Sequence, residues 1–491
     1  MPRHILISLI VACALFMENM DSTIIATSLP AIAKGLGEHP LSLNLGLTAY
    51  LVSLAVFIPV SGWVADRVGS RTVFLVAIVV FMLGSVLCAA SQTLGFFVAA
   101  RFFQGLGGAM MVPVGRMVLL KSAPKSEMVV ALNYLTTPSL IGPVVGPALG
   151  GFITLYFNWR WIFLVNVPIS ILGLVLAWRH IPNYKGEDLK PLDLRGFGLT
   201  SIGLAALMLG MSTLGRHLLP WGAAVGLLLG GVLVLGGYAW HAARVRHPLI
   251  DMRLFRFPTL RTGVVGGSFF RAGTGATPFL MPLMMQLGFG LDPFRSGLIT
   301  CFTAVGAMFM KTFTVKILRR FGFRSVMASN ALLASLSLMA AALFTSATPH
   351  LIIMATLLIS GCMRSLQFTA LNAISFADVD KREISDATAL SSMAQRLSQS
   401  VGVTVGALAL QVVTYMHHRD AVQAEDFPPA ILFVGLVSML SMIWVLRLPA
   451  DAGDEISGHG AARGEGGGTL PQPAPPSPTQ SPPHTPPSSR N

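Results

Sequence analysis

Apolar runs of about twenty residues recur along most of this chain, and they limit what it can fold into more than any other feature. A helix that crosses the hydrocarbon core of a bilayer needs roughly 20 consecutive, mostly apolar residues. The runs are separated by charge clusters and Pro/Gly turns, and they predict about fourteen spanning helices. They lie near residues 8–33, 43–63, 72–91, 94–117, 127–156, 161–178, 197–214, 220–240, 262–288, 294–314, 325–345, 350–377, 386–416 and 428–446.

The composition agrees with a membrane protein. Of the 491 residues, 53% are hydrophobic and 11% are charged, whereas a soluble domain carries roughly 25% charged residues. So few charges cannot cover a water-facing surface on a chain of this length. The expected fold class is therefore an all-α polytopic membrane protein whose main solvent is lipid.

The 34 Lys and Arg residues, which contribute to a formal net charge of +13, indicate the orientation of the chain. Many fall in alternate connections between the runs, at Arg67 and Arg71 and within 179–195, 244–261 and 316–324. Basic residues are enriched in cytoplasmic loops. We therefore expect a multi-pass protein of the cell inner membrane with both termini in the cytoplasm, and no nucleic-acid partner.

The chain after about residue 450 has a different composition, because it is rich in Pro and Ser and cannot bury a core. We predict four regions. They are an amino-terminal six-helix bundle (1–195), an inserted transmembrane helix pair (196–245), a carboxyl-terminal six-helix bundle (246–449) and a disordered cytoplasmic tail (450–491).

A motif rich in Gly and Arg stands between the second and third predicted spans. It reads Gly62-Trp-Val-Ala-Asp66-Arg67-Val-Gly69-Ser-Arg71. Its glycines permit a tight turn between packed helices, and Asp66 can pair with the arginines at a helix end and latch one conformation. The alternative is an ordinary basic turn. The motif resembles the G-x-L-A-D-R-x-G-x-R loop of the major facilitator superfamily.

The second half of the chain carries degenerate copies of two motifs from the first half. They match Gly69 with Gly322, Arg71 with Arg324, Arg101 with Arg364 and Gln104 with Gln367. Nearly equal separations are what a duplicated transporter with an inserted helix pair should show.

Four further motifs resemble those of the fourteen-span drug:proton antiporters of this superfamily. They are Met20-Asp21-Ser-Thr23-Ile-Ile-Ala-Thr-Ser-Leu-Pro30, Arg101-Phe-Phe-Gln104-Gly105-Leu-Gly107-Gly108-Ala109, Gly142-Pro143-Val-Val-Gly146-Pro147-Ala-Leu-Gly150-Gly151 and Trp159-Arg160-Trp161-Ile-Phe163-Leu-Val-Asn166-Val-Pro168. The stretch from Gly107 to Arg116 resembles that of the MdtD-like multidrug exporters. The resemblance covers residues 1 to about 450. It implies the major facilitator fold, with two six-helix bundles, an inserted helix pair and alternating access around a central site.

Ionisable residues inside spans are costly and are functional candidates. Glu18 and Asp21 are three residues apart, so one face of the first helix presents both. Desolvation and mutual repulsion should help one of these carboxyl groups to bind a proton. We predict proton coupling by Asp21, Glu18 and Arg101, since the resemblance makes Arg101 the partner of the acids. The alternatives are a packing hydrogen bond for Asp21, a water-exposed position for Glu18 and a structural role for Arg101. Glu18 departs from the resemblance, because MdtD-like proteins carry an uncharged polar residue there.

Basic residues outnumber acids within the predicted spans. Arg116 and Lys311 lie near cytoplasmic ends, where snorkelling explains them. Arg271, Arg364 and Arg396 lie deeper and have no evident acidic partner, so an anionic or chelate-type substrate could supply the missing charge; backbone carbonyls and internal water are the alternative. We predict a substrate pathway lined by Gln104, Arg271, Arg364, Gln367 and Arg396.

The run from Gly142 to Gly151 combines close helix approach at its glycines with kinks at Pro143 and Pro147. By resemblance, this antiporter motif (Gly142, Pro143, Gly146, Pro147, Gly150 and Gly151) seals the substrate pathway toward one side during exchange.

The resemblance implies a proton-coupled efflux antiporter that exports drugs or other toxic small molecules across the inner membrane by alternating access. An exporter of organic anions or metal chelates is the alternative, and a non-transporting membrane sensor is a further one. We expect no enzyme, because neither H-E-x-x-H nor G-x-x-x-x-G-K-[ST] occurs. We also expect no metal and no cofactor, since the proton gradient drives export. The expected partners are a small-molecule substrate, protons and the bilayer; the chain is expected to be a monomer, and no periplasmic adaptor is identified.

Overall fold

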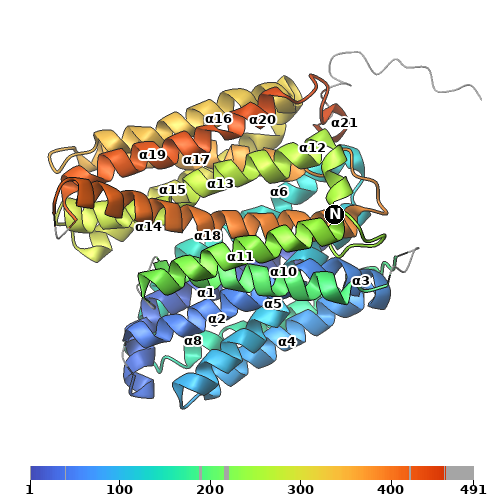
Figure 1. Ribbon diagram of the computed structural model, residues 1–491, viewed down its shortest axis with the longest axis horizontal. Helices are drawn as coiled ribbons and strands as arrows, with labels where there is room; N and C mark the ends of the chain where they lie inside the picture. Colours follow the sequence, from blue (N-terminus) through green and yellow to red (C-terminus); the bar gives the residue numbers. More distant parts are fainter. Residues whose placement is uncertain are drawn as a thin grey trace, which may run out of the picture.

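Helices make up most of the described chain (Figure 1). The computed structural model describes residues 2–38, 40–186, 191–214, 220–419, 422–457 and 459, and no strand occurs in these ranges. The expectation of an all-α membrane fold is therefore confirmed.

The helices fall into two groups and a pair. The amino-terminal group contains α1 (Arg3–Leu36), α2 (Asn44–Phe57), α3 (Ser61–Val68), α4 (Ser70–Ala90), α5 (Leu94–Ser122), α6 (Met128–Ser139), α7 (Ile141–Tyr156), α8 (Trp161–Leu164) and α9 (Asn166–His180). The carboxyl-terminal group contains α12 (Pro258–Arg261), α13 (Gly267–Gly275), α14 (Thr277–Leu283), α15 (Pro293–Phe321), α16 (Phe323–Met339), α17 (His350–Ile374), α18 (Ile384–Met416), α19 (Phe427–Met439) and α20 (Ser441–Leu446). The pair, α10 (Leu194–Leu214) and α11 (Trp221–Ala242), packs together, and α10 also contacts α2 and α18.

Within the described residues, 12 helical stretches are long and apolar enough to cross a membrane. They account for all but two of the predicted spans. The span predicted at 127–156 is divided between α6 and α7 at Leu140, and the span predicted at 262–288 is divided between α13 and α14, with a π-helical turn at each end.

Proline explains the first interruption, and π-helical turns mark the second. Pro143 has no N–H to direct to the carbonyl of Ser139, and the Nδ2 of Asn19 on α1 lies 3.5 Å from that oxygen. In the second interrupted span, π-helical turns at Thr262–Gly266 and Met284–Gly288 flank the short helices. Spanning helices tolerate such breaks when neighbouring groups satisfy the backbone.

The beginning of α1 and the end of α20 lie at the same end of the molecule, at the right of Figure 1. We call this end the termini face. The Nε2 of His4 lies 2.5 Å from Glu127, and the Nζ of Lys125 lies 3.2 Å from Glu455, so the beginning of α1 and the segment after α20 both contact the segment between α5 and α6.

The outer surface of the helices is apolar. On α11, for example, Leu229 is 66% exposed and Leu233 is 78% exposed. Water would make such a surface costly, whereas lipid tails solvate it, so these side chains fit contact with the bilayer.

The expected tail begins at residue 450, but residues 451–457 form a turn and the short helix α21 (Asp454–Ser457). Except for His459, residues from 458 onward lie outside the described ones.

Candidate substrate and proton site

Asp21 of α1 is the centre of a buried polar network. Its side chain is 1% exposed, and its Oδ2 lies 2.7 Å from Nη1 of Arg101 on α5. Its Oδ1 accepts hydrogen bonds from Nε2 of Gln104 and Nδ2 of Asn166, each at 3.0 Å. One guanidinium and two amides therefore stabilise the charged carboxylate, as buried charges require. The predicted pairing of Arg101 with an acid of the first helix is present.

A second layer of contacts fixes these donors. The Oγ of Ser85 on α4 accepts from Gln104 at 2.9 Å and from Asn166 at 3.3 Å. The guanidinium of Arg101 lies over the ring of Tyr50, 4.4 Å from its centroid, and also donates to Gln104. Among the described residues, its Nε and Nη2 have no hydrogen-bond partner. Loss of the charge on Asp21 would thus leave Arg101 poorly compensated.

Glycines bring α5 close enough for this network to form. A Cβ on Gly107 would lie 2.5 Å from the backbone nitrogen of Phe81 on α4, and a Cβ on Gly105 would lie 2.7 Å from Cβ of Ser53 on α2. The glycines that follow Gln104 therefore permit direct contact of α5 with α2 and α4.

Glu18, one helical turn before Asp21, has a different partner. Its carboxylate forms an ion pair and hydrogen bond with Arg396 of α18, in the carboxyl-terminal group. Glu18 is 3% exposed, whereas the side chain of Arg396 is 28% exposed. The expectation that Arg396 has no acidic partner is therefore wrong: α18 packs against α5, and Arg396 reaches Glu18 of α1 from a position 378 residues away in the sequence.

The other basic residues of the spans lack such a pair. Both Nη atoms of Arg116 lie 3.5 Å from Oε1 of Gln395, and Nη2 of Arg271 lies 3.3 Å from Oδ1 of Asn372. In the described part of the chain, no carboxylate forms an ion pair with either arginine.

Lys311 and Arg364 are the other two basic residues of the spans without a carboxylate partner. The Nζ of Lys311 is 2.6 Å from the hydroxyls of Thr136 on α6 and Thr369 on α17, and the residue is 5% exposed. Lys311 therefore points between the two groups, and the snorkelling expected for it is wrong, as it is for Arg116, which is 4% exposed. The described residues give Arg364 no hydrogen bond or ion pair.

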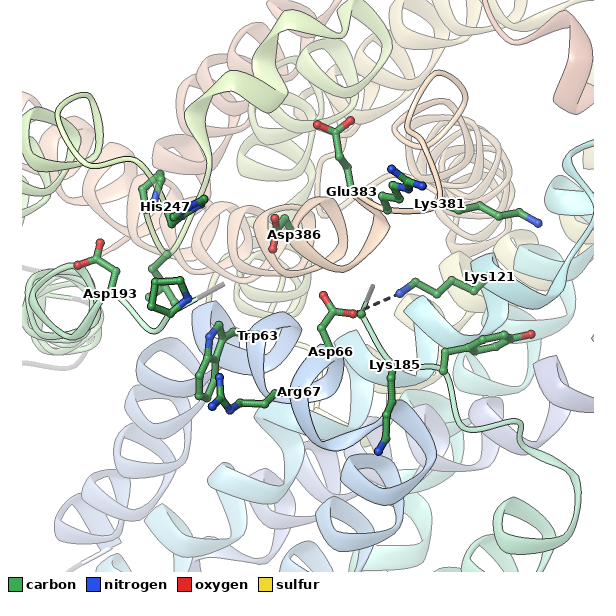
Figure 2. Close-up of a pocket in the computed structure, with 16 residues that line it drawn as sticks. Trp63, Asp66, Arg67, Lys121, Lys185, Asp193, His247, Lys381, Glu383 and Asp386 are labelled. Atoms are coloured by element: carbon green, nitrogen blue, oxygen red, sulfur yellow. Dashed lines mark hydrogen bonds and ion pairs between the residues drawn. The ribbon is translucent and has the colours of Figure 1, made fainter. Parts of the chain in front are cut away.

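Asp66 of the predicted latch joins the two groups of helices at the termini face. Its Oδ1 accepts from Oγ of Ser385 at 2.7 Å and lies 3.3 Å from Nζ of Lys121 (Figure 2). Asp66 thus bonds to α5 and α18, and the described contacts do not include the expected pairing with the motif's arginines. Since Ser385 lies in the first turn of α18, the helix dipole also favours a negative charge there.

The remaining residues of this motif fix the turn. Gly69 has φ +106°, and a Cβ there would lie 2.4 Å from Asn183, whereas a Cβ on Gly62 would lie 2.8 Å from the carbonyl oxygen of Ser385. The guanidinium of Arg67 lies 5.4 Å from the ring centroid of Trp63, and the backbone N–H of Arg71 donates to Asn183 at 3.0 Å.

A cavity of about 400 Å³ opens beside this latch. Figure 2 shows Asp66, Arg67 and Lys185 on one wall, and Glu383 and Asp386 on the facing wall. It lies at the termini face and is separate from the network around Asp21.

The antiporter motif packs α7 against the segment of α1 that carries Asp21. A Cβ on Gly142 would lie 3.0 Å from the backbone of Met20, and one on Gly146 would lie 2.1 Å from Oγ1 of Thr23. No atom lies within 4 Å of a Cβ placed on Gly151. The backbone oxygen of Gly150 accepts from Thr154. The side chains of Pro143 and Pro147 lie outside the described ones.

The two halves of the chain share the backbone conformation of the matched motifs. Gly322 has φ +71° between α15 and α16, as Gly69 has a positive φ between α3 and α4. Gln104 and Gln367 differ, however, because Oε1 of Gln367 accepts from Asn330 at 3.0 Å and meets no carboxylate among the described residues. The acid network is therefore seen only on the amino-terminal side of the described structure.

The comparisons with known proteins agree with this architecture. The family model described as Major Facilitator Superfamily matches residues 11–403 and 263–483. The chain belongs to the major facilitator superfamily.

Curated relatives of this chain show which members of the superfamily it resembles. The chain is 38% identical over 446 residues to the putative multidrug resistance protein MdtD of Serratia proteamaculans, covering 90% of this chain and 93% of that one. It is 37% identical over 448 residues to the MdtD of Yersinia enterocolitica, with 90% and 95% covered. The resemblance to MdtD-like proteins is confirmed.

Two solved structures share the fold. The human organic anion transporter MFSD10 superposes with a TM-score of 0.67 at 12% identity, covering 91% of this chain and 100% of that one. The proton:xylose symporter XylE superposes with a TM-score of 0.64 at 14% identity, with 94% and 98% covered. The family match and the MdtD relatives make the protein an integral membrane transporter of small molecules and not an enzyme.

Sequence reasoning missed several residues of the site. Asn166 is a buried amide within an apolar span, which is a usable signal, and it stands in a motif quoted for the family resemblance. Ser85, Gln395 and Ser385 carry no such signal, because small or neutral polar residues are common in spanning helices.

Proposed function

We propose that this transporter is a proton-coupled antiporter that exports drugs or other toxic small molecules across the inner membrane by alternating access. The observation that carries the proposal is the pair of buried acids on one turn of α1. Asp21 holds Arg101 within its own group of helices, and Glu18 holds Arg396 of the other group.

The distribution of basic residues supports the orientation. The termini face carries the basic clusters of the sequence, so we assign it to the cytoplasm. The predicted regions 1–195 and 246–449 are then the two moving bundles, and 196–245 is the inserted pair. The contacts of Asp66, Lys311 and Arg116 between the groups all lie toward this face, so the described conformation is closed to the cytoplasm.

A proton cycle follows from these contacts. A proton that reaches Glu18 from the opposite face removes its charge and breaks the ion pair with Arg396. This weakens the contact between the bundles and favours opening to the cytoplasm, where the proton leaves and the substrate binds. The gradient supplies about 1.4 kcal/mol per pH unit and roughly 2.3 kcal/mol per charge per 100 mV.

The relatives support the choice of substrate. The MdtD proteins are named as putative multidrug resistance proteins, and they match this chain over 90% of its length. We carry that substrate class over as part of the proposal.

One observation favours a second candidate, export of organic anions or metal chelates. Arg116, Arg271, Lys311 and Arg364 have no carboxylate ion pair within the described residues. A substrate with negative charge would compensate them, whereas a lipophilic cation would add to the excess.

Substrate-dependent proton release in energised inverted vesicles tests both candidates. Cationic dyes and citrate-like anions are added to wild type, Asp21→Asn, Glu18→Gln and the control Glu425→Gln, whose carboxylate is 72% exposed on the 3₁₀ turn Ala424–Asp426. Dye-driven release that is lost in Asp21→Asn or Glu18→Gln and kept in the control supports drug antiport. Release driven only by anions moves the assignment to the second candidate, and unchanged coupling in both variants rejects the proton site.

A further inference from the structure

The chain does not leave the protein after its last spanning helix. Beyond α20 it crosses the termini face from the carboxyl-terminal group toward the amino-terminal group. Helix α21 lies at this face in Figure 1 and contacts both α15 and α6. Leu448 is 2% exposed, Ala452 8% and Ile456 1%, so the segment is packed down. If this segment were part of a disordered tail, these apolar side chains would be exposed to water.

The carboxyl-terminal group holds this segment through several contacts. Gly453 has φ +80°, and a Cβ there would lie 2.7 Å from Ile374 and from Phe323, so the turn requires glycine. Nδ1 of His459 lies 2.9 Å from the carbonyl oxygen of Arg319, in the last turn of α15. These contacts lie on α15, α16 and α17.

The amino-terminal group touches the same segment on its other side. Helix α21 packs against α6 and against the 3₁₀ turn Lys125–Glu127 that precedes it. The Nζ of Lys125 lies 3.2 Å from Oε2 of Glu455, with the two side chains 46% and 69% exposed. Such an exposed ion pair is weak by itself. The segment is therefore anchored to one group and rests on the other.

We propose that residues 451–457 and His459, which we call the strap, hold the two groups of helices together at the termini face. When this face opens, the strap stays with α15–α17 and leaves α6 and the Lys125–Glu127 turn. Because the strap stabilises only the closed state, it sets how often the transporter opens on this side. The proposal rests on the two-state cycle of the proposed function, but it requires neither a particular substrate nor proton coupling.

The distance between the groups at the termini face tests the strap. Spin labels are placed on Thr72→Cys at the start of α4 and Arg320→Cys near the end of α15, after Cys13, Cys88, Cys301 and Cys362 are replaced by Ser. The ratio of long to short distances is measured in lipid for the full chain and for a chain that ends at Pro449. Removal of the strap should raise this ratio on the order of tenfold, as expected for loss of about one buried apolar side chain and its neighbours.

A second truncation and two charge-reversal variants separate the strap from other effects. A chain that ends at His459 keeps the strap and loses only the Pro/Ser-rich remainder, so its distances should equal those of the full chain. Lys125→Glu should shift the ratio in the same direction as removal of the strap, and Lys125→Glu with Glu455→Lys should reverse that shift. These point variants keep the test valid if the chain ending at Pro449 fails to fold.

Either of two results would overturn the proposal. The chain ending at Pro449 could show the same distances as the full chain, or the chain ending at His459 could open as far as the chain ending at Pro449. Because the labels report only the separation of the helices, a failure of the strap is distinguishable from a failure of proton-coupled export. The latter would leave these distances responsive while abolishing proton release.

Discussion

Glu18 and Asp21 lie on one turn of α1, but their arginines lie on different groups of helices. Arg101 belongs to α5 and moves with Asp21, so protonation of Asp21 changes the interior of one group. Arg396 belongs to α18, so protonation of Glu18 changes the contact between groups. In the proposed cycle, Glu18 therefore has the more direct route of the two acids to a conformational change.

A double-mutant cycle measures the Glu18–Arg396 pair. Arg396→Gln leaves a buried carboxylate without its cation and should cost about 1–3 kcal/mol of stability, toward the low end of buried pairs because Arg396 is 28% exposed. Glu18→Gln with Arg396→Gln should cost less than the sum of the single changes by about 1 kcal/mol. Unfolding in detergent measures this coupling, and additive costs would show that the pair does not stabilise the described state.

The two ion pairs also show which contacts a sequence can predict. The pairing of Asp21 with Arg101 follows from the scarcity of acids in the spans and from the family motifs. The pairing of Glu18 with Arg396 joins residues 378 positions apart, on helices of different halves. Hydropathy gives the existence of both helices but neither their mutual rotation nor their depth, so Arg396 was expected to lack an acid.

Helix packing depends on glycines that sequence periodicity does not single out. Gly306 of α15 and Gly361 of α17 lie at the contact between these helices, and a Cβ on either would lie 2.0 Å from a carbonyl oxygen of the other helix, that of Leu358 or Thr303. Backbone atoms cannot yield as a flexible side chain can, so the two helices would have to separate. The interrupted spans are a second feature that the sequence does not single out. Apolar composition predicts that a segment crosses the membrane, but it does not predict that the segment stays one continuous helix.

Substitution of one of these glycines tests the packing of α15 on α17. Gly361→Ala should lower the free energy of unfolding by about 1–3 kcal/mol, as overpacking of a close contact does. Gly226→Ala on α11 is the matched control, because no atom lies within 4 Å of the added Cβ. It should leave stability unchanged or raise it slightly, since alanine favours the helix. Equal thermal midpoints for both variants would contradict the close contact.

At the scale of the whole molecule, the groups of helices meet through polar contacts arranged from the membrane interior to the termini face. Glu18 with Arg396 lies deepest, Lys311 with Thr136 and Arg116 with Gln395 follow, and Asp66 with Ser385 lies at the face itself. In the proposed cycle, opening toward this face has to break all of these contacts. Water can replace each of these contacts once the face is open. The free-energy barrier to opening is therefore divided among several weak polar contacts.

Lys311 offers a test of this interface because it bridges the groups without a carboxylate. Burial of its ammonium is unfavourable, and the two hydroxyls it contacts already donate to backbone carbonyls, at 2.9 Å from Thr136 to Leu132 and from Thr369 to Ser365. Lys311→Met keeps the shape of the side chain and removes this cost. It should therefore leave the thermal midpoint unchanged or higher, while the fraction of molecules open to the termini face falls because water no longer gains an ammonium to solvate.

The matched control for Lys311→Met is Lys316→Met, one turn closer to the termini face on the same helix. The distance between labels at Thr72 and Arg320 gives the open fraction, and unfolding in detergent gives the midpoint. A large fall in the midpoint of Lys311→Met would show that the lysine stabilises the closed interface. A midpoint that holds while the open fraction falls would show that the buried amine favours opening, so that the residue is kept for the transport cycle at the expense of the closed state.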